Sequence, residues 1–129
     1  MDAEELFDVA HDRCAELPGS RLTRPFGFGW DVYKVRGKVF ALLTEEPGRP
    51  MVILKADPFD SELLRGNHAE ITPGYHMNKR HWISVEAGPG IDAALVADLV
   101  TDSYLLVVEK LPRRERPVDP GTFARDGRT

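Results

Sequence analysis

Hydrophobic positions recur along this chain with two periods, one typical of helices and one of strands. Between residues 2 and 17, apolar side chains return every three or four positions, as on one face of a helix, with Arg13 as the polar exception. Asp2 followed by Glu5 forms a capping pattern, and Pro18-Gly19 stops the periodicity. The pattern predicts an amphipathic helix over residues 2–17.

Three β-like runs follow this helix. The first, Trp30–Arg36, is separated from the second, Lys38–Thr44, by Arg36-Gly37, a pair typical of a tight hairpin turn. The third run, Met51–Lys55, comes after a turn rich in proline and glycine. The second and third runs are apolar on both alternations, which predicts strands that are buried on both faces.

The second half of the chain predicts two further helices and a strand. Asp57 before a proline is a strong helix start, which predicts a short helix over Pro58–Arg65. A strand is expected around His81–Glu86, after a loop. Asp92 can cap a last helix, which is expected to run to about Lys110.

This order of elements predicts an α+β fold. Tight hairpins imply an antiparallel sheet, and the N- and C-terminal helices are expected to pack on one face of it. A length of 129 residues with 42% hydrophobic content suits one domain, expected at residues 1–111. Residues 112–129 are rich in proline, glycine and arginine and are expected to form a disordered tail.

Composition narrows the cellular setting. Cys14 is the only cysteine, so no intramolecular disulfide can form, and a buried thiol in a reducing compartment is expected. The acidic N-terminus does not resemble a signal peptide, and no apolar run is long enough to cross a membrane. We therefore expect a cytoplasmic protein without a membrane segment, and we favour a monomer.

The net charge of −4 conceals two patches of opposite sign. Residues 1–20 hold six acids and one arginine, whereas residues 21–40 hold five cations and one acid. A polyanion responds to the charge within a Debye length of about 10 Å. The acidic balance of the whole chain therefore argues only mildly against a nucleic-acid ligand.

Two stretches combine side chains that suit a nucleic acid. In Gly74–Trp82, Lys79 and Arg80 could contact phosphates, Asn78 could contact a base edge, and the rings could stack. The alternative is structural, with the rings as core anchors and Asn78 as a turn residue. The basic hairpin tip is the second candidate, although such tips also protect exposed sheet edges. The candidate nucleic-acid-binding residues are Lys34, Arg36, Lys38, Tyr75, His76, Asn78, Lys79, Arg80 and Trp82.

No catalytic or metal-binding pattern is assembled in the sequence. It lacks CxxC, HExxH, GxSxG and GxxxxGK[ST] motifs. Cys14 follows His11 by one helical turn, but nothing nearby would orient the imidazole. His76 and His81 are weak metal candidates because tetrahedral zinc needs about four ligands. We therefore expect a binding protein that is not an enzyme and that carries no cofactor or metal.

Several short segments carry a family resemblance: LPGS at Leu17–Ser20, PFG at Pro25–Gly27, KVFALL at Lys38–Leu43, PGYHMNKRHW at Pro73–Trp82, and SYLLVVEKLP directly after Asp102. Together they resemble the MmcQ/YjbR family of small bacterial domains, over about residues 3–115. The resemblance implies a frataxin-like (CyaY-like) α+β fold. It also implies a DNA-binding protein with two wing-like elements, here Lys34–Lys38 and Tyr75–Trp82.

Two other functions stay open. The Tyr75–Trp82 segment could instead be the wall of a site for a protein or a small ligand. The acidic first helix could bind a metal ion or a basic partner, because frataxins, whose fold the resemblance implies, use such a helix in iron handling. The acids concerned are Asp2, Glu4, Glu5, Asp8 and Asp12.

Overall fold

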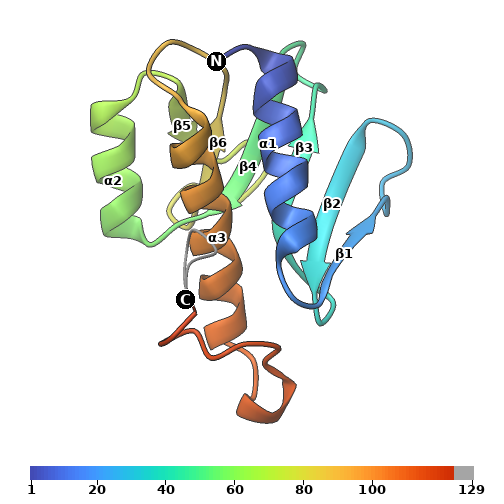
Figure 1. Cartoon of the computed structure of the whole chain (residues 1–129). Coiled ribbons are helices and arrows are strands. Elements are labelled where there is room, and N and C mark those ends of the chain that lie inside the picture. Colours follow the sequence, from blue (N-terminus) through green and yellow to red (C-terminus); the bar gives the residue numbers. More distant parts are fainter. Residues whose placement is uncertain (124–129) are drawn as a thin grey trace.

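Two helices lie across one face of a six-stranded sheet (Figure 1). This computed structural model describes residues 1–123. The elements in chain order are α1 (Ala3–Glu16), β1 (Ser20–Thr23), β2 (Trp30–Val35), β3 (Lys38–Thr44), β4 (Met51–Lys55), α2 (Pro58–Asn67), β5 (Ile71–Pro73), β6 (Trp82–Val85), α3 (Ala93–Glu109) and the 3-10 helix η1 (Arg113–Glu115). The strand order is β1-β2-β3-β4-β6-β5, and every neighbouring pair is antiparallel. The predicted α+β class, with both terminal helices on the sheet, is confirmed.

The α-helices begin where the sequence pattern predicts, because each has an aspartate that satisfies a free backbone N–H of its first turn. The Oδ1 atoms of Asp2, Asp57 and Asp92 accept the N–H groups of Glu5, Phe59 and Leu95 at 2.8, 2.9 and 2.8 Å. No helix within residues 1–123 combines the length and the apolar character that crossing a bilayer requires.

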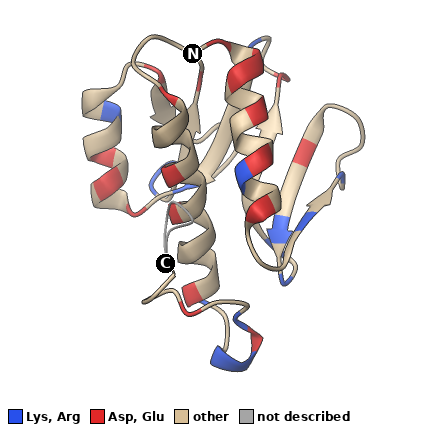
Figure 2. Cartoon of the chain, in the orientation of Figure 1, with Lys and Arg blue, Asp and Glu red and all other residues tan. Residues whose placement is uncertain are grey.

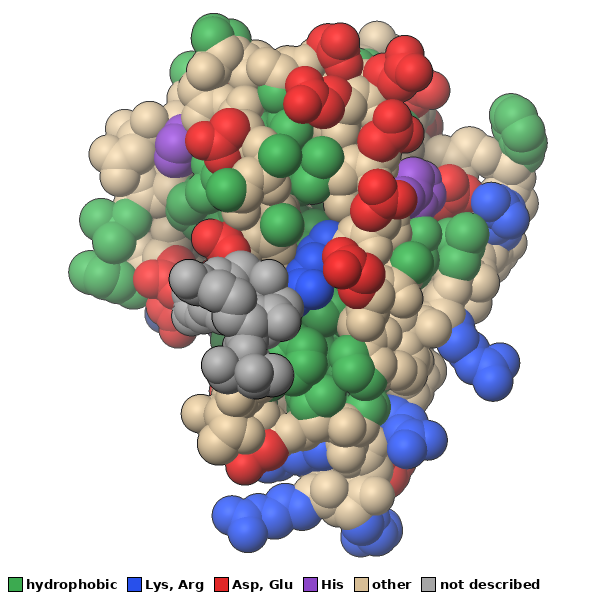
Figure 3. All heavy atoms as spheres, in the orientation of Figure 1, with side chains coloured by type: hydrophobic (Ala, Val, Ile, Leu, Met, Phe, Trp, Pro, Cys, Tyr) green, Lys and Arg blue, Asp and Glu red, His purple; other side chains and the backbone are tan. Residues whose placement is uncertain are grey.

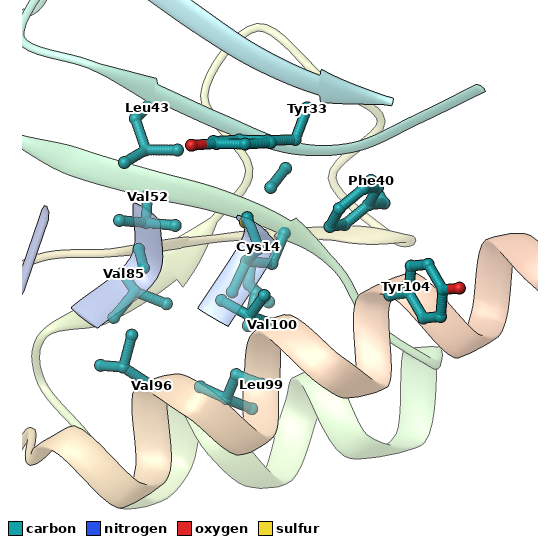
Figure 4. Close-up of a cluster of buried hydrophobic side chains, with 14 of the residues drawn as sticks. Cys14, Tyr33, Phe40, Leu43, Val52, Val85, Val96, Leu99, Val100 and Tyr104 are labelled. Carbon is teal, nitrogen blue, oxygen red and sulfur yellow. The ribbon is translucent and has the colours of Figure 1, made fainter. Parts of the chain in front are cut away.

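The sheet separates two apolar clusters. The larger one lies between the sheet and the helices α1 and α3, on a side that is termed the helix face, and it includes Cys14, Phe40 and Tyr104 (Figure 4). The smaller one lies on the opposite side, termed the loop face, and its buried members are Val32, Leu42, Met51 and Ile53. Strands β3 and β4 contribute to both clusters, which confirms that they are buried on both faces.

The polar exception in the apolar stripe of α1 is buried with its guanidinium satisfied. Arg13 is only 7% exposed, and its Nε donates to Thr101 Oγ1 on α3 at 2.7 Å. A buried charge requires such partners because its desolvation is costly. Arg13 therefore joins the two terminal helices instead of interrupting the core.

The structure adds two strands that the sequence pattern does not predict. Both β1 and β5 are edge strands, paired on one side only. The residues of β1 are exposed or half-buried, so the segment shows no alternation of apolar positions that would indicate a strand. Its pairing with β2 comes from backbone hydrogen bonds, which leave little trace in the side-chain pattern.

The first part of the expected tail lies against the domain. Beyond η1, the side chains of Val118 and Phe123 pack on the helix-face cluster, and the ring centroids of Phe123 and Tyr104 are 6.2 Å apart. Residues 112–123 thus add apolar contacts to the core. The remainder of the expected tail, residues 124–129, lies outside the described residues.

Candidate functional site

The antiparallel strands give the sheet two ends of different chemistry. The β2–β3 turn and the β5–β6 connection leave one end, whereas the β1–β2 loop and the β3–β4 turn leave the other. The first end is termed the basic end and comprises Arg21, residues 34–38, and residues 79–82. The second end is termed the aromatic–carboxylate end and comprises residues 24–31 and 44–49, together with Tyr75 and His76, which reach it from the β5–β6 connection.

The β2–β3 turn presents three cations at the basic end. Arg36 and Gly37 have positive φ angles of 51° and 78°, which confirms the tight hairpin turn that the sequence predicts. The Nε of Arg36 donates to the carbonyl oxygen of Glu115 at 2.9 Å, so η1 lies against the turn. Arg36 and Lys38 are exposed and Lys34 is half-buried.

A like-charge pair lies beside this turn. Arg21 on β1 is the direct cross-strand partner of Lys34 on β2, so the two side chains lie on the same face of the sheet. Like charges in that position destabilise a sheet. Within residues 1–123, no carboxylate forms an ion pair with Arg21, Lys34 or Lys38. The basic end therefore holds cations whose charge no described acid neutralises.

The β5–β6 connection adds two more cations where it returns to the sheet. The Nζ of Lys79 donates to the carbonyl oxygen of Gly74, and Gly74 N donates to Trp82 O at 2.8 Å. A Cβ on Gly74 would lie 2.6 Å from the Cβ of Trp82, so only glycine fits this crossing. Strand β6 is two strands from β3, or about 10 Å. Lys79 and the exposed Arg80 thus share the end of the sheet that bears the β2–β3 turn.

Asn78 has a structural role in this connection. Its Oδ1 accepts the N–H of Arg80 at 2.9 Å, and its carbonyl oxygen accepts the N–H groups of His81 and Trp82 at 3.2 and 3.0 Å. The side-chain oxygen that was expected to contact a base edge is thus part of a turn. Trp82 is half-buried and packs on the loop-face cluster. Its cross-strand partner on β4 is Lys55.

Tyr75 and His76 lie at the aromatic–carboxylate end. The rings of Tyr75 and Trp30 are stacked, with centroids 6.4 Å apart and planes at 7°. The Glu46 carboxylate accepts the Trp30 Nε1–H and the Tyr75 hydroxyl (3.3 Å), and the His76 Nε2 lies 3.4 Å from it. The Trp30 hydrogen bond is the main cause that lowers the pKa of Glu46. The candidate residues are therefore divided between the two ends of the sheet.

Sequence reasoning missed most of the aromatic–carboxylate end. The side chains of Phe26 and Phe28 in the β1–β2 loop are 66% and 104% exposed, and Phe26 packs edge-on against Trp30 with centroids 6.0 Å apart. Gly27 and Gly29, which flank Phe28, both have positive φ. Glycines beside both phenylalanines favour an irregular loop over a core strand. This alternation of phenylalanine and glycine is the sequence signal that could have identified the loop.

The cations of this second end, unlike those of the basic end, are neutralised. Arg24 pairs with Asp31 at 2.9 Å and Arg49 pairs with Glu86 at 2.8 Å. A further acid, Glu45, is exposed. This end is therefore rich in rings and carboxylates and has little free positive charge.

Asp31, His11 and Tyr33 on the helix face are arranged like a catalytic relay, but the Tyr33 hydroxyl is not accessible. His11 Nε2 lies 3.5 Å from Asp31 Oδ2, and His11 Nδ1 is 2.7 Å from the Tyr33 hydroxyl. Tyr33 is 5% exposed, and burial is the main cause that raises its pKa to about 12. Burial also raises the pKa of the Cys14 thiol, which is fully enclosed. This geometry connects α1 to β2 and offers no reactive oxygen or sulfur to a substrate.

The acids of α1 form a separate surface on the helix face (Figure 3). Within residues 1–123, no three histidine, cysteine or acidic side chains come together as a group that could hold a metal ion. The geometry consequently gives no support to the metal-binding alternative for this helix. It leaves the acidic surface as a region that repels a polyanion.

Sequence comparisons connect the chain to a family of small proteins. A family model described as YjbR matches residues 15–106. Uncharacterized protein YbdF of Escherichia coli O157:H7 is 46% identical over 122 residues, which cover 94% of this chain and 100% of the relative. Uncharacterized protein YjbR of Escherichia coli strain K12 is 33% identical over 103 residues, which cover 80% of this chain and 87% of the relative.

Solved structures agree with this relationship. The crystal structure of protein DR2400 of Deinococcus radiodurans, with the family-model domain DUF419, matches with a TM-score of 0.76 and 35% identity, covering 85% of this chain and 84% of that one. A crystal structure of a Pseudomonas syringae protein matches with a TM-score of 0.65 and 28% identity, covering 82% of this chain and 98% of that one. The observed α+β architecture is thus one that solved relatives share.

Proposed function

The chain belongs to the YjbR family, and from the charge distribution of its fold we propose that it is a non-enzymatic domain that binds nucleic acid, above all DNA, at the basic end of its sheet. The resemblance to the family implies the same ligand. The observation that carries the proposal is the set of unneutralised cations at this end, with Arg21 opposite Lys34 as its centre. Like charges held together without acids are stabilised when a polyanion binds between them.

The distribution of acids supports one direction of approach. Lys and Arg gather at the lower ends of β1 and β2 and in η1, whereas Asp and Glu run along α1 (Figure 2). A duplex that approached α1 would meet six acids in residues 1–20. A duplex at the basic end would meet the turn cations and Arg80, and only the last turn of α1, at Glu16, lies next to this end.

The expected contacts are to phosphates more than to bases. Lys34, Lys38 and Arg80 are suited to the backbone of the ligand, whereas the oxygen of Asn78 is engaged in its turn. Tyr75 and His76 are engaged with Glu46 at the opposite end. We therefore propose binding with little sequence preference, by a monomer in the cytoplasm, and without a catalytic step.

Fluorescence anisotropy of a labelled DNA duplex at about 50 and 200 mM salt tests this function. We expect saturable binding at low salt that weakens steeply at the higher salt, since each neutralised phosphate lowers log K by about 0.9 per tenfold rise in salt. Arg80→Glu should weaken binding to unrelated sequences alike. It is a better probe than Lys79→Glu, because the Lys79 ammonium also closes the β5–β6 connection.

Two results would remove the proposal. One is the absence of binding at both salt concentrations. The other is binding that survives Arg80→Glu and Lys34→Glu together with an unchanged salt dependence, because the ligand would then lie elsewhere on the protein.

A further inference from the structure

A cleft opens at the aromatic–carboxylate end, remote from the cations of the proposed nucleic-acid site. Its volume is about 630 Å³, and it lies between α1, the β1–β2 loop, the start of β2 and the β3–β4 turn. That volume is in the range of small-ligand sites, about 300–1,000 Å³. The lining side chains that matter for its chemistry are Phe28, Trp30, Asp31, Glu45 and Glu46.

The charge of this cleft favours a cation. Among the described residues that line it, three carry carboxylates and one, Arg24, carries a guanidinium. Arg24 is paired with Asp31 at 2.9 Å, so its charge is already neutralised. An anion would be repelled by Glu45 and Glu46. A neutral apolar ligand would desolvate these carboxylates without offering them hydrogen bonds, which is costly.

The two glutamates contribute in different ways. Glu46 is held from three sides, by the indole of Trp30, the hydroxyl of Tyr75 and the imidazole of His76. The same indole hydrogen bond lowers the pKa of Glu46, so this carboxylate stays ionised at neutral pH. The Glu45 side chain forms no hydrogen bond or ion pair with any residue from 1 to 123. Glu46 thus fixes the negative field, and Glu45 is available to bind a ligand directly.

The rings of the cleft add the second element of cation recognition. Phe28 is 104% exposed, and its neighbours Gly27 and Gly29 have open space around them and positive φ. Trp30 also lines the cleft, and its ring is stacked on that of Tyr75. Aromatic faces attract cations within about 6 Å of the ring centre, and a guanidinium both stacks on a ring and pairs with a carboxylate through its planar fork.

We propose that this cleft is a binding site for a guanidinium group, which pairs with Glu45 and lies against Phe28 and Trp30. The site is additional to the proposed nucleic-acid function and does not depend on it. Two sources share this chemistry: a free guanidinium compound and an arginine side chain of a protein. An ammonium would bind less well, because it lacks the planar face and the bidentate geometry.

The test follows the Trp30 indole N–H signal by NMR while agmatine, or a short uncharged peptide with one central arginine, is added to the full chain. We expect saturable shifts, and about fivefold weaker binding for Glu45→Gln and for Phe28→Ala. The matched controls are Glu62→Gln and Phe59→Ala, at exposed positions of α2, which should bind as the unmodified chain does. The same peptide with lysine in place of arginine should bind more weakly.

The possible results distinguish the two sources of the guanidinium group and include results that would overturn the proposal. Agmatine binding as tightly as the peptide supports a free small molecule, whereas peptide binding at least tenfold tighter supports a protein side chain. The proposal is overturned if neither probe gives saturable shifts. It is equally overturned if Glu45→Gln and Phe28→Ala bind as well as the controls, with circular dichroism confirming that each variant is folded. Because no nucleic acid is present, these results are independent of DNA binding.

Discussion

The two ends of the sheet both carry charged side chains, but only one of them neutralises its cations. At the aromatic–carboxylate end, Arg24 and Arg49 are paired with acids at 2.9 and 2.8 Å. At the basic end, Arg21 and Lys34 lie opposite each other, and no acid within residues 1–123 pairs with either. We propose that this difference marks the basic end as the surface for an external ligand of opposite sign, because its cations are held together on adjacent strands and no described acid pairs with them.

The largest expected effect comes from reversing charge at the basic end. The double change Lys34→Glu with Lys38→Glu removes two phosphate contacts and should weaken duplex binding about 100-fold near 50 mM salt. The slope of log K against log salt should become shallower by about 2. Anisotropy titrations at several salt concentrations measure both quantities.

The control for this change is Arg49→Glu at the opposite end. It replaces one cation by an acid beyond the reach of the proposed site, at a position that is exposed and paired with Glu86. Duplex affinity should change by less than about threefold, since only long-range charge is altered. An equal loss in the control and in the double variant would show that net charge matters and the basic end does not.

The next effect tests the connection that reaches both ends. Gly74→Ala places a Cβ 2.6 Å from the Cβ of Trp82 and 3.0 Å from its backbone. We expect a loss of about 2 kcal/mol in the free energy of unfolding, since the crossing backbones must move apart. Gly66→Ala in α2 is the matched control because nothing lies within 4 Å of its Cβ position, and it should be neutral or slightly stabilising.

Urea denaturation of both glycine variants measures this difference. If Gly74→Ala were as stable as Gly66→Ala, the 74–82 segment would not be held against the sheet as the structure has it. The structure's placement of Lys79 at one end of the sheet and Tyr75 at the other, both by this segment, would then also be contradicted.

The smallest effect concerns the titration of Glu46. Its folded-state pKa is lowered below 4.5, chiefly by the Trp30 hydrogen bond, so the ionised form is the one that the fold favours. The stabilisation that it contributes is complete above the unfolded pKa of about 4.5 and is lost as pH falls through the lowered folded pKa. The Trp30 indole N–H signal, followed by NMR from pH 7 to 3, should shift with a midpoint below 4.5.

Two comparisons make this titration specific. Glu46→Gln should abolish the shift, and the indole signal of Trp82, which has no hydrogen bond to a carboxylate within residues 1–123, should change little. A Trp30 midpoint at or above 4.5 would contradict the favourable hydrogen bond to the ionised carboxylate.

Most of the fold could be predicted because its signals are local. Helix starts follow from the capping aspartates Asp2, Asp57 and Asp92, and the doubly buried strands follow from their apolar content. The edge strands β1 and β5 could not, because pairing on one side leaves their side chains without a regular pattern. The packing of Val118 and Phe123 could not be predicted from composition, because their apolar contacts are made with residues far away in the sequence.

The candidate site could be predicted only in part, because the chemistry of a segment does not tell which way its side chains lie. Residues 75–82 are contiguous and interleave rings with cations, yet Tyr75 and His76 contact Glu46 while Lys79 and Arg80 belong to the opposite end. The role of Glu46 depends on contacts between segments 16 and 29 residues apart. Only the tertiary fold brings these together.

The most direct test of the different roles of the two ends is an NMR titration of the isotope-labelled protein with an unlabelled DNA duplex at low salt. We expect the backbone amide shifts to change at residues 20–22, 34–38 and 79–82, while those at residues 26–31 and 44–46 stay in place. Shifts concentrated at the aromatic–carboxylate end or along α1, or no shifts at all, would contradict it.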